Sequence, residues 1–115
     1  MDFKEKHEFL QRSEECLRIR AKYPEKIPTI IQKGNKRAPE IDKNKFLIGK
    51  EFTMAGVLGT IRKRIRLSSE EALFMFVNNE VLVPHGFMTL AEIYEKHKDK
   101  DGFLYIYYSG ENTFG

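Results

Sequence analysis

Apolar positions in the first half of the chain change from helical to strand spacing. Between residues 9 and 22 apolar side chains recur about every three to four positions, which predicts an amphipathic helix that ends before YPEKIP. A shorter helical turn is expected just before it, at FKEKH. The β-branched run 27–32 and the segment KFLIG at 45–49 each predict a strand, and KGNKRAPE between them predicts a turn or loop. Two strands at this separation indicate a hairpin.

Capping residues mark the helices of the second half. Thr53 is expected to cap a helix that runs to the RKRIR segment, and Gly56 and Gly59 inside it each cost about 1 kcal/mol relative to alanine. Because these glycines destabilise the helix, we expect that another part of the protein packs closely against them. Thr89 and Glu92 have the spacing of a capping box at the start of a further helix. Its inward-facing residues are expected to be Leu90, Ile93 and Tyr94.

Three more strands are expected around these helices. Ser68 and Glu71 have capping-box spacing over a short turn, after which the run 73–77 is apolar on both faces and predicts a buried strand. The segment EVLVP at 80–84 predicts a short return strand, and residues 103–108 predict the closing strand. The order helix, β, β, helix, β, β, helix, β indicates an α+β fold of the β-grasp, ubiquitin-like type in one domain of 115 residues.

The composition excludes several classes of protein. One cysteine, Cys16, excludes an internal disulfide and is expected to pack inside the protein, and the three histidines have no metal-ligand spacing. No apolar run approaches the roughly 20 residues of a membrane span, and the start lacks the apolar stretch of a signal peptide. We therefore expect a cytoplasmic protein without a cofactor or metal.

Charge is divided unevenly along the chain. Residues 1–66 hold 17 lysines and arginines against 9 acidic residues, whereas residues 67–115 hold 3 against 8. The first half should attract acidic partners such as acidic peptides, anionic lipids, tubulin tails or nucleic acid. The RKRIR cluster at 62–66 is more typical of a solvated helix end than of a binding site.

Four segments in order carry a resemblance to a known family. The chain resembles the ubiquitin-like modifiers of autophagy, of the GABA-A-receptor-associated-protein and microtubule-associated-protein light-chain type, over nearly its whole length. The segments are KYPEKIP at 22–28, KFLIGKEFT at 45–53, IRKRIRLSSEEALFMFVNN at 61–79 and FLYIYYSGENTFG at 103–115. The resemblance implies a ubiquitin-like domain over 25–115, with a flexible tail from 109 and two extra N-terminal helices within 1–24 packed on it.

The resemblance also implies a function for the end of the chain. In proteins of this kind the terminal glycine is activated, carried as a thioester and transferred to the amine of phosphatidylethanolamine on autophagosomal membranes. Here that residue would be Gly115, and Phe114 would be recognised by the activating and conjugating enzymes. A glycine suits a narrow active-site channel because it has no Cβ. A processing or delipidating cysteine protease is a further candidate partner. The chain itself would be a substrate and not an enzyme.

A peptide-binding groove is expected along the 45–49 strand. This strand should form a sheet edge that accepts a Trp/Phe/Tyr-x-x-Leu/Ile/Val motif as an added strand. Alternation sends Lys45 and Leu47 to one side and Phe46 and Ile48 to the other. By resemblance, an aromatic pocket uses Glu15, Ile19, Pro28, Ile30, Lys45, Leu47 and Phe103. An aliphatic pocket uses Phe46, Ile48, Phe52, Val57, Ile61 and Arg64.

Three positions depart from the family pattern. Val57 and Thr60 stand where bulkier residues are usual, and Gly49 replaces a frequent proline, so the aliphatic pocket should be wider or more polar. Taken alone, Ile19, Pro28 and Phe103 are also compatible with ordinary core. Lys26, together with Lys45 and Arg64, is expected to pair with acids that flank the bound motif.

Other functions remain open at this point. An unconjugated trafficking or cytoskeletal adaptor could use the basic first half on tubulin tails. An RNA-binding module lacks the aromatic and basic strand signature of such proteins, so no nucleic acid is expected. No set of residues assembles a nucleophile, a base and oxyanion donors.

Overall fold

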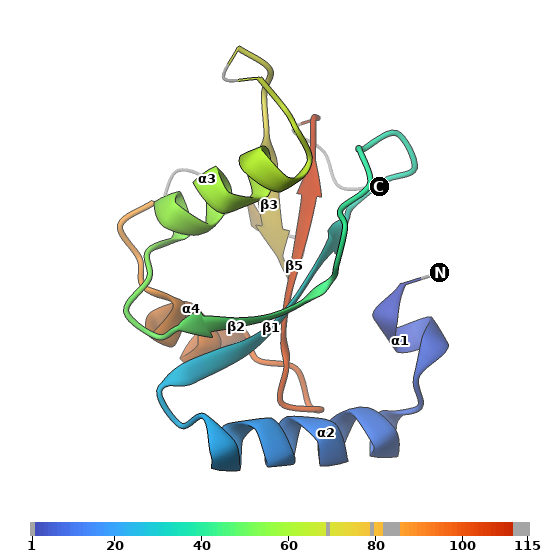
Figure 1. Cartoon of the computed structure of the whole chain (residues 1–115), viewed down its shortest axis with the longest axis vertical. Coiled ribbons are helices and arrows are strands. Elements are labelled where there is room, and N and C mark those ends of the chain that lie inside the picture. The colour runs from blue at the N-terminus through green and yellow to red at the C-terminus, as the bar shows by residue number, and fades with distance from the viewer. Residues whose placement is uncertain (1, 69, 79, 82–85, 112–115) are drawn as a thin grey trace.

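The computed structural model describes residues 2–68, 70–78, 80–81 and 86–111. Each predicted helix and strand is present within these ranges, and the remainder of the predicted 80–84 strand lies outside them (Figure 1). In chain order the elements are α1 (Phe3–Lys6), α2 (Phe9–Lys22), β1 (Lys26–Lys33), β2 (Lys45–Gly49), α3 (Met54–Arg64), β3 (Phe74–Val77), β4 (Glu80–Val81), α4 (Leu90–His97) and β5 (Leu104–Ser109).

The five strands form one mixed sheet in the order β2-β1-β5-β3-β4. β1 and β2 pair antiparallel as the predicted hairpin, whereas β1 and β5 pair parallel in the centre of the sheet. β3 pairs antiparallel with both β5 and β4. The first and last strands therefore lie side by side, and α3 crosses one face of the sheet (Figure 1). This is the β-grasp arrangement, so the predicted fold class is confirmed.

Alternation along the two central strands divides the core in two. Ile31 and Ile106 are register partners, and both belong to the main core that contains the inner faces of α3 and α4. Their neighbours Ile30 and Tyr105 are also register partners and pack on the opposite face, with α1 and α2. Successive residues of a strand point to opposite faces. The two N-terminal helices therefore cover a face that would otherwise expose apolar side chains.

Two of the three predicted N-caps are confirmed. Thr53 Oγ1 accepts a hydrogen bond from Gly56 N at 3.3 Å, and Thr89 and Glu92 form a reciprocal capping box. The Ser68 capping box is wrong, because the Glu71 amide donates to the Ser68 backbone carbonyl in a turn and not to its hydroxyl. The two side chains instead contact each other at 3.2 Å.

The glycines of α3 differ in their surroundings. A Cβ at Gly56 would lie 3.4 Å from the Phe52 ring, which agrees with the close packing expected there. A Cβ at Gly59 would have no neighbour within 4 Å. The expectation of close packing at Gly59 is therefore wrong.

A buried polar network joins the N-terminal helices to β5. Arg12 Nε donates to Asp101 Oδ2 at 2.8 Å, and Asp101 also accepts from Tyr105 OH at 2.5 Å and from Phe103 N at 2.8 Å. Burial and the hydrogen bond to Asp101 raise the pKa of Tyr105 above its ordinary value. Since Asp101 is 2% exposed, each of these donors offsets the cost of burying its charge.

Candidate functional site

β2 lies at the edge of the sheet, with β1 on one side and no strand of the described residues on the other. Within β2, Phe46 is buried whereas Leu47 is 39% exposed. The predicted edge and the predicted alternation are both confirmed. A free edge offers backbone N–H and C=O groups to an extended peptide, and this is how strand-addition sites bind.

A hollow of about 310 Å³ lies between β2 and α3. This volume is at the lower end of the range for ligand sites, about 300–1,000 Å³. The lining residues are Lys26, Ile31, Phe46, Leu47, Ile48, Gly49, Phe52, Val57, Thr60 and Arg64. Five of the six residues predicted for the aliphatic pocket are therefore brought together.

The sixth residue, Ile61, is 1% exposed and lies in the core behind the hollow. Leu47, expected in the aromatic pocket, lines this hollow instead. The sequence reasoning did not include Ile31, although its place in the β1 alternation gives the signal that could have found it. The hollow is thus built from the β1–β2 hairpin and one face of α3.

The rim of the hollow is charged, whereas its wall is mostly apolar. Arg64 Nη1 donates to both carboxylate oxygens of Asp42, at 2.8 and 2.9 Å, and its guanidinium lies 5.2 Å from the Phe46 ring centroid. The hydrogen bond from Arg64 lowers the pKa of Asp42. Thr60 Oγ1 donates to Gly56 O at 3.1 Å, so its hydroxyl proton is already used inside α3.

The residues predicted for the aromatic pocket lie close together, and several of them are buried. Ile30 and Phe103 have no exposed surface and pack in the second core with Phe3. Lys45 is the register partner of Ile30, and its ammonium forms an ion pair with Glu15 of α2. This pair bridges the space between β2 and α2.

The remaining members of the aromatic pocket are partly accessible at most. Ile19 is half-buried against the second core, and Pro28 is buried within β1. Phe3 is a member of this cluster that the sequence reasoning missed. Its only signal was one apolar residue in the charged segment FKEKH, whereas its contact with Phe103, 5.4 Å between ring centroids, spans most of the chain.

A larger hollow of about 630 Å³ lies between α1 and the 34–44 loop. Its charged lining consists of lysines and carboxylates in equal number, namely Lys6, Lys33, Lys36, Lys43, Asp2, Glu5, Glu40 and Asp42. Opposite charges that neutralise one another in an open, polar site do not favour one class of ligand. We therefore prefer the smaller hollow beside β2 as the candidate site.

The predicted tail residues Phe114 and Gly115 lie outside the described residues. Within the described part of the chain, no group of three metal-ligating side chains could hold an ion, and no helix is long and apolar enough to span a bilayer. Cys16 is buried as expected, and burial raises the pKa of its thiol to about 11.

The β-grasp sheet, its two N-terminal helices and its accessible edge strand define a ubiquitin-like protein with a candidate peptide-binding edge. The family described as "Autophagy protein Atg8 ubiquitin like" matches residues 11–115. The chain belongs to this Atg8 family.

Individual relatives agree with this assignment along the whole chain. The chain is 51% identical over 114 residues to Autophagy-related protein 8e of Arabidopsis thaliana, covering 98% of this chain and 92% of that protein. It is 50% identical to Autophagy-related protein 8 of Mycosarcoma maydis, covering 98% and 95%. The crystal structure of Trypanosoma brucei ATG8 aligns with a TM-score of 0.87 at 39% identity, covering 100% of this chain and 98% of that one.

Membership in the family settles the general function. The protein is an autophagy ubiquitin-like modifier and not an enzyme, and lipidation and cargo-receptor binding are general properties of the family. Membership implies partners in the autophagy conjugation machinery and association with autophagosomes.

Proposed function

We propose that this chain is joined through Gly115 to phosphatidylethanolamine, and that the β2 edge then recruits proteins with a Trp/Phe/Tyr-x-x-Leu/Ile/Val motif. The observation that carries the peptide-binding half is the hollow of about 310 Å³ beside an accessible edge strand. The family match, which extends through residue 115, supports the conjugation half. The protein would be cytoplasmic before conjugation and on the autophagosomal membrane after it.

The tail chemistry is acyl transfer performed by other proteins. An activating enzyme and then a conjugating enzyme would hold the Gly115 carboxyl as a thioester. The lipid amine attacks the thioester carbonyl, the amide bond forms, and the enzyme thiol leaves. The absence of a Cβ at Gly115 keeps the carbonyl accessible, and Phe114 supplies an apolar side chain for recognition. A cysteine protease would process or reverse the conjugate.

Peptide binding would break the Lys45–Glu15 ion pair and could also exchange the Arg64–Asp42 pair. The aliphatic residue of the motif would enter the hollow between β2 and α3 directly. The aromatic residue would have to separate Lys45 from Glu15 to reach Ile30 and Phe103. Acids flanking the motif would then pair with Lys45, with Lys26, or with Arg64 in place of Asp42. Such exchanges affect association rate and register more than affinity.

An unconjugated adaptor for acidic tubulin tails is the second candidate. The observation that favours it is the excess of cations in residues 1–66, 17 against 9 acidic residues. The two candidates differ in whether Gly115 is needed.

The decisive experiment is reconstitution with the activating and conjugating enzymes, ATP and phosphatidylethanolamine vesicles. Intact mass should show one lipid on the wild-type chain, and no lipid on Gly115→Ala because the added Cβ obstructs the reacting carbonyl. Leu47→Ala should accept the lipid normally. An enzyme set shown to be active on another Atg8-family protein provides the positive control.

Peptide binding should show the opposite pattern in the same two variants. Leu47→Ala removes an exposed side chain from the wall of the hollow and should weaken a motif peptide roughly tenfold, or about 1.4 kcal/mol. Gly115→Ala should bind the peptide like the wild type. Unchanged affinity in Leu47→Ala would refute the groove assignment, and normal lipidation of Gly115→Ala would refute the tail assignment.

A further inference from the structure

The last described residues place the exit of the tail beside the 34–44 loop. Gly34 N donates to Tyr108 O at 2.7 Å, and Asn35 Nδ2 donates to Ser109 Oγ at 2.9 Å. Glu111 then forms an ion pair with Arg37 of the same loop. Four residues extend at most about 14 Å. A lipid on Gly115 would therefore lie within a short distance of this end of the molecule.

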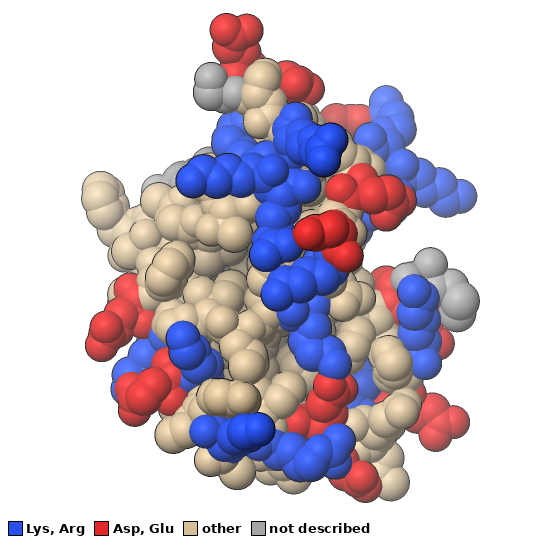
Figure 2. Space-filling model, in the orientation of Figure 1, with Lys and Arg blue, Asp and Glu red and all other residues tan. Residues whose placement is uncertain are grey.

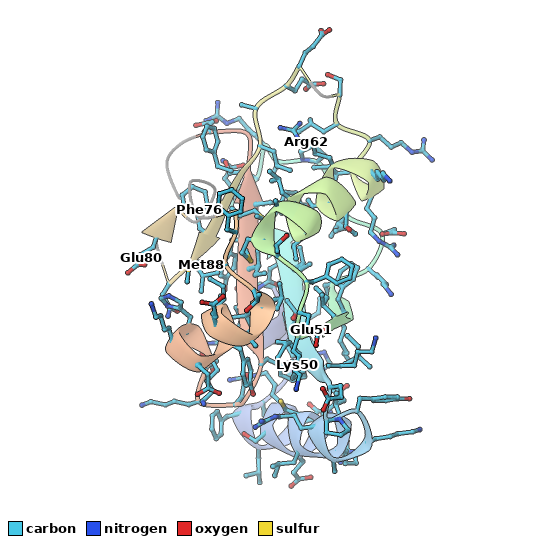
Figure 3. All side chains as sticks on the ribbon, turned by 90° about the vertical axis from the view of Figure 1, so that its left-hand side faces the viewer. Lys50, Glu51, Arg62, Phe76, Glu80 and Met88 are labelled. Atoms are coloured by element: carbon cyan, nitrogen blue, oxygen red, sulfur yellow. The ribbon has the colours of Figure 1, made fainter. Side chains whose placement is uncertain are left out.

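The segment that follows α3 forms the other side of the tail exit. Ser109 is the register partner of Phe74, and a Cβ on Gly110 would lie 3.8 Å from the carbonyl oxygen of Ala72. Arg62 fixes this segment, because its Nη1 donates to Ser68 O at 2.9 Å and to Glu71 O at 2.7 Å (Figure 3). The C-terminal end of α3 thus lies close to the exit as well.

Cations outnumber acids on these two segments. Residues 33–43 and 62–71 hold eight lysines and arginines against four carboxylates, and Glu111 adds a fifth. Figure 2 shows blue side chains gathered over the C-terminal end of α3 and the 34–44 loop, with fewer red ones among them, beside a largely uncharged flank over the rest of α3. Four of the cations form no ion pair with any described residue and are exposed: Lys36, Lys43, Lys63 and Arg66. We call these four residues the tail-exit surface. Lys36 and Lys43 also line the larger hollow, but the two carboxylates of the same loop, Glu40 and Asp42, are already paired with Lys33 and Arg64.

One member of this surface occupies a strained backbone position. Arg66 has φ +59°, and Leu67 N donates to Arg62 O at 3.0 Å, as in the glycine-capped ending typical of helices. Glycine is the usual residue at this position because other side chains are strained there. Arg66 is exposed and forms no ion pair with a described residue, so its charge is available to an anionic ligand.

We propose that the tail-exit surface binds the anionic phospholipid headgroups of the membrane to which the tail is attached. The orientation rests on the proposed conjugation of Gly115, whereas the charge complementarity does not. A lipid on Gly115 would tether the chain at one point, and basic residues beside that tether are attracted to an anionic membrane surface, which favours one orientation of the domain. Each lysine or arginine near an anionic surface contributes about fivefold in binding, and the effect falls with salt.

The test is flotation of the unconjugated full chain with vesicles of phosphatidylcholine alone or mixed with phosphatidylserine. The wild type should bind only the phosphatidylserine vesicles and should dissociate at high salt. The combined variant Lys36→Gln, Lys63→Gln, Arg66→Gly should lose roughly a hundredfold in partitioning. The matched control is Lys96→Gln, Lys98→Gln, Lys100→Gln, which removes equal charge before β5, about 20 Å away along that strand. It should retain most of the binding.

The proposal is supported if the first triple variant loses binding and the control variant retains it. Absence of wild-type binding, or equal loss in the two triple variants, would overturn it. A glutamate-rich peptide that bound more tightly than the vesicles, and that the first triple variant lost, would assign the surface to a protein partner and overturn the lipid proposal. Thermal unfolding of both variants shows that they are folded. Since no enzyme is present, a negative result would leave conjugation of Gly115 unaffected.

Discussion

Arg66 combines a backbone conformation that favours glycine with an exposed charged side chain. Its left-handed backbone ends α3 and directs the chain into the 67–73 segment, and this geometry favours glycine. Asn78 has a similar φ of +51°, but asparagine tolerates that region well. No residue pattern indicates this strain, because RKRIR is typical of an ordinary charged helix end.

Arg66→Gly should therefore stabilise the protein. Removing the side chain relieves the left-handed strain, and we expect about 1 kcal/mol more stability in urea unfolding. Lys63→Gly is the matched control, since it removes the same charge from a helical position and should cost about 1 kcal/mol. A loss of stability in Arg66→Gly would contradict the assignment of strain.

At the scale of elements, α3 joins the two proposed surfaces. One face contributes Val57, Thr60 and Arg64 to the hollow beside β2, and its C-terminal end contributes to the tail-exit surface. Gly59 of the same helix is exposed, and a Cβ added there would have no neighbour within 4 Å. No contact in the described structure explains that glycine.

Gly59→Ala should stabilise α3 by about 1 kcal/mol, because alanine restricts the unfolded chain and nothing obstructs its methyl group. Gly102→Ala should destabilise by at least as much. Gly102 has φ +97°, and a Cβ there would lie 2.7 Å from Cys16 Sγ. Thermal unfolding measures both changes, and shifts of the same sign would refute the difference in environment.

Local pattern predicted the elements better than it predicted the site. Strong periodicity and the Thr53 and Thr89 caps fixed helices and strands to within a residue or two. The predicted Ser68 capping box is wrong because spacing alone does not show whether the Glu71 amide donates to the Ser68 hydroxyl or to its backbone carbonyl. Ile61 is buried because of the way α3 docks on the sheet. The Lys45–Glu15 ion pair across the expected aromatic pocket likewise depends on how α2 docks. Spacing within one element contains no information on that docking.

At the scale of the whole molecule, the Arg12–Asp101 network holds the N-terminal helices against the domain. The two residues are 89 positions apart, so no local signal pairs them. The Arg12 side chain is 10% exposed and that of Asp101 is fully buried. Pairs of this kind are strongly destabilising when one partner is removed.

Arg12→Ala should therefore cost about 3 kcal/mol in urea unfolding, since the buried Asp101 carboxylate would lose its cationic partner. Lys4→Ala is the control, because Lys4 pairs with Asp99 at 2.6 Å with a 42% exposed side chain. We expect it to cost less than about 1 kcal/mol. Equal costs would show that the buried network is not the main attachment of the helices.

The parallel pairing of β1 with β5 also determines how the protein would respond to force. If a membrane holds the chain beyond β5 and cargo holds it at β2, the tension passes from strand to strand through β1. The β1–β5 ladder runs over five register pairs, from Thr29–Leu104 to Lys33–Tyr108. Tension along β5 would shear these hydrogen bonds together and not open them one after another. If both attachments form, the order of the strands would place this ladder of parallel hydrogen bonds on the path of tension between membrane and cargo.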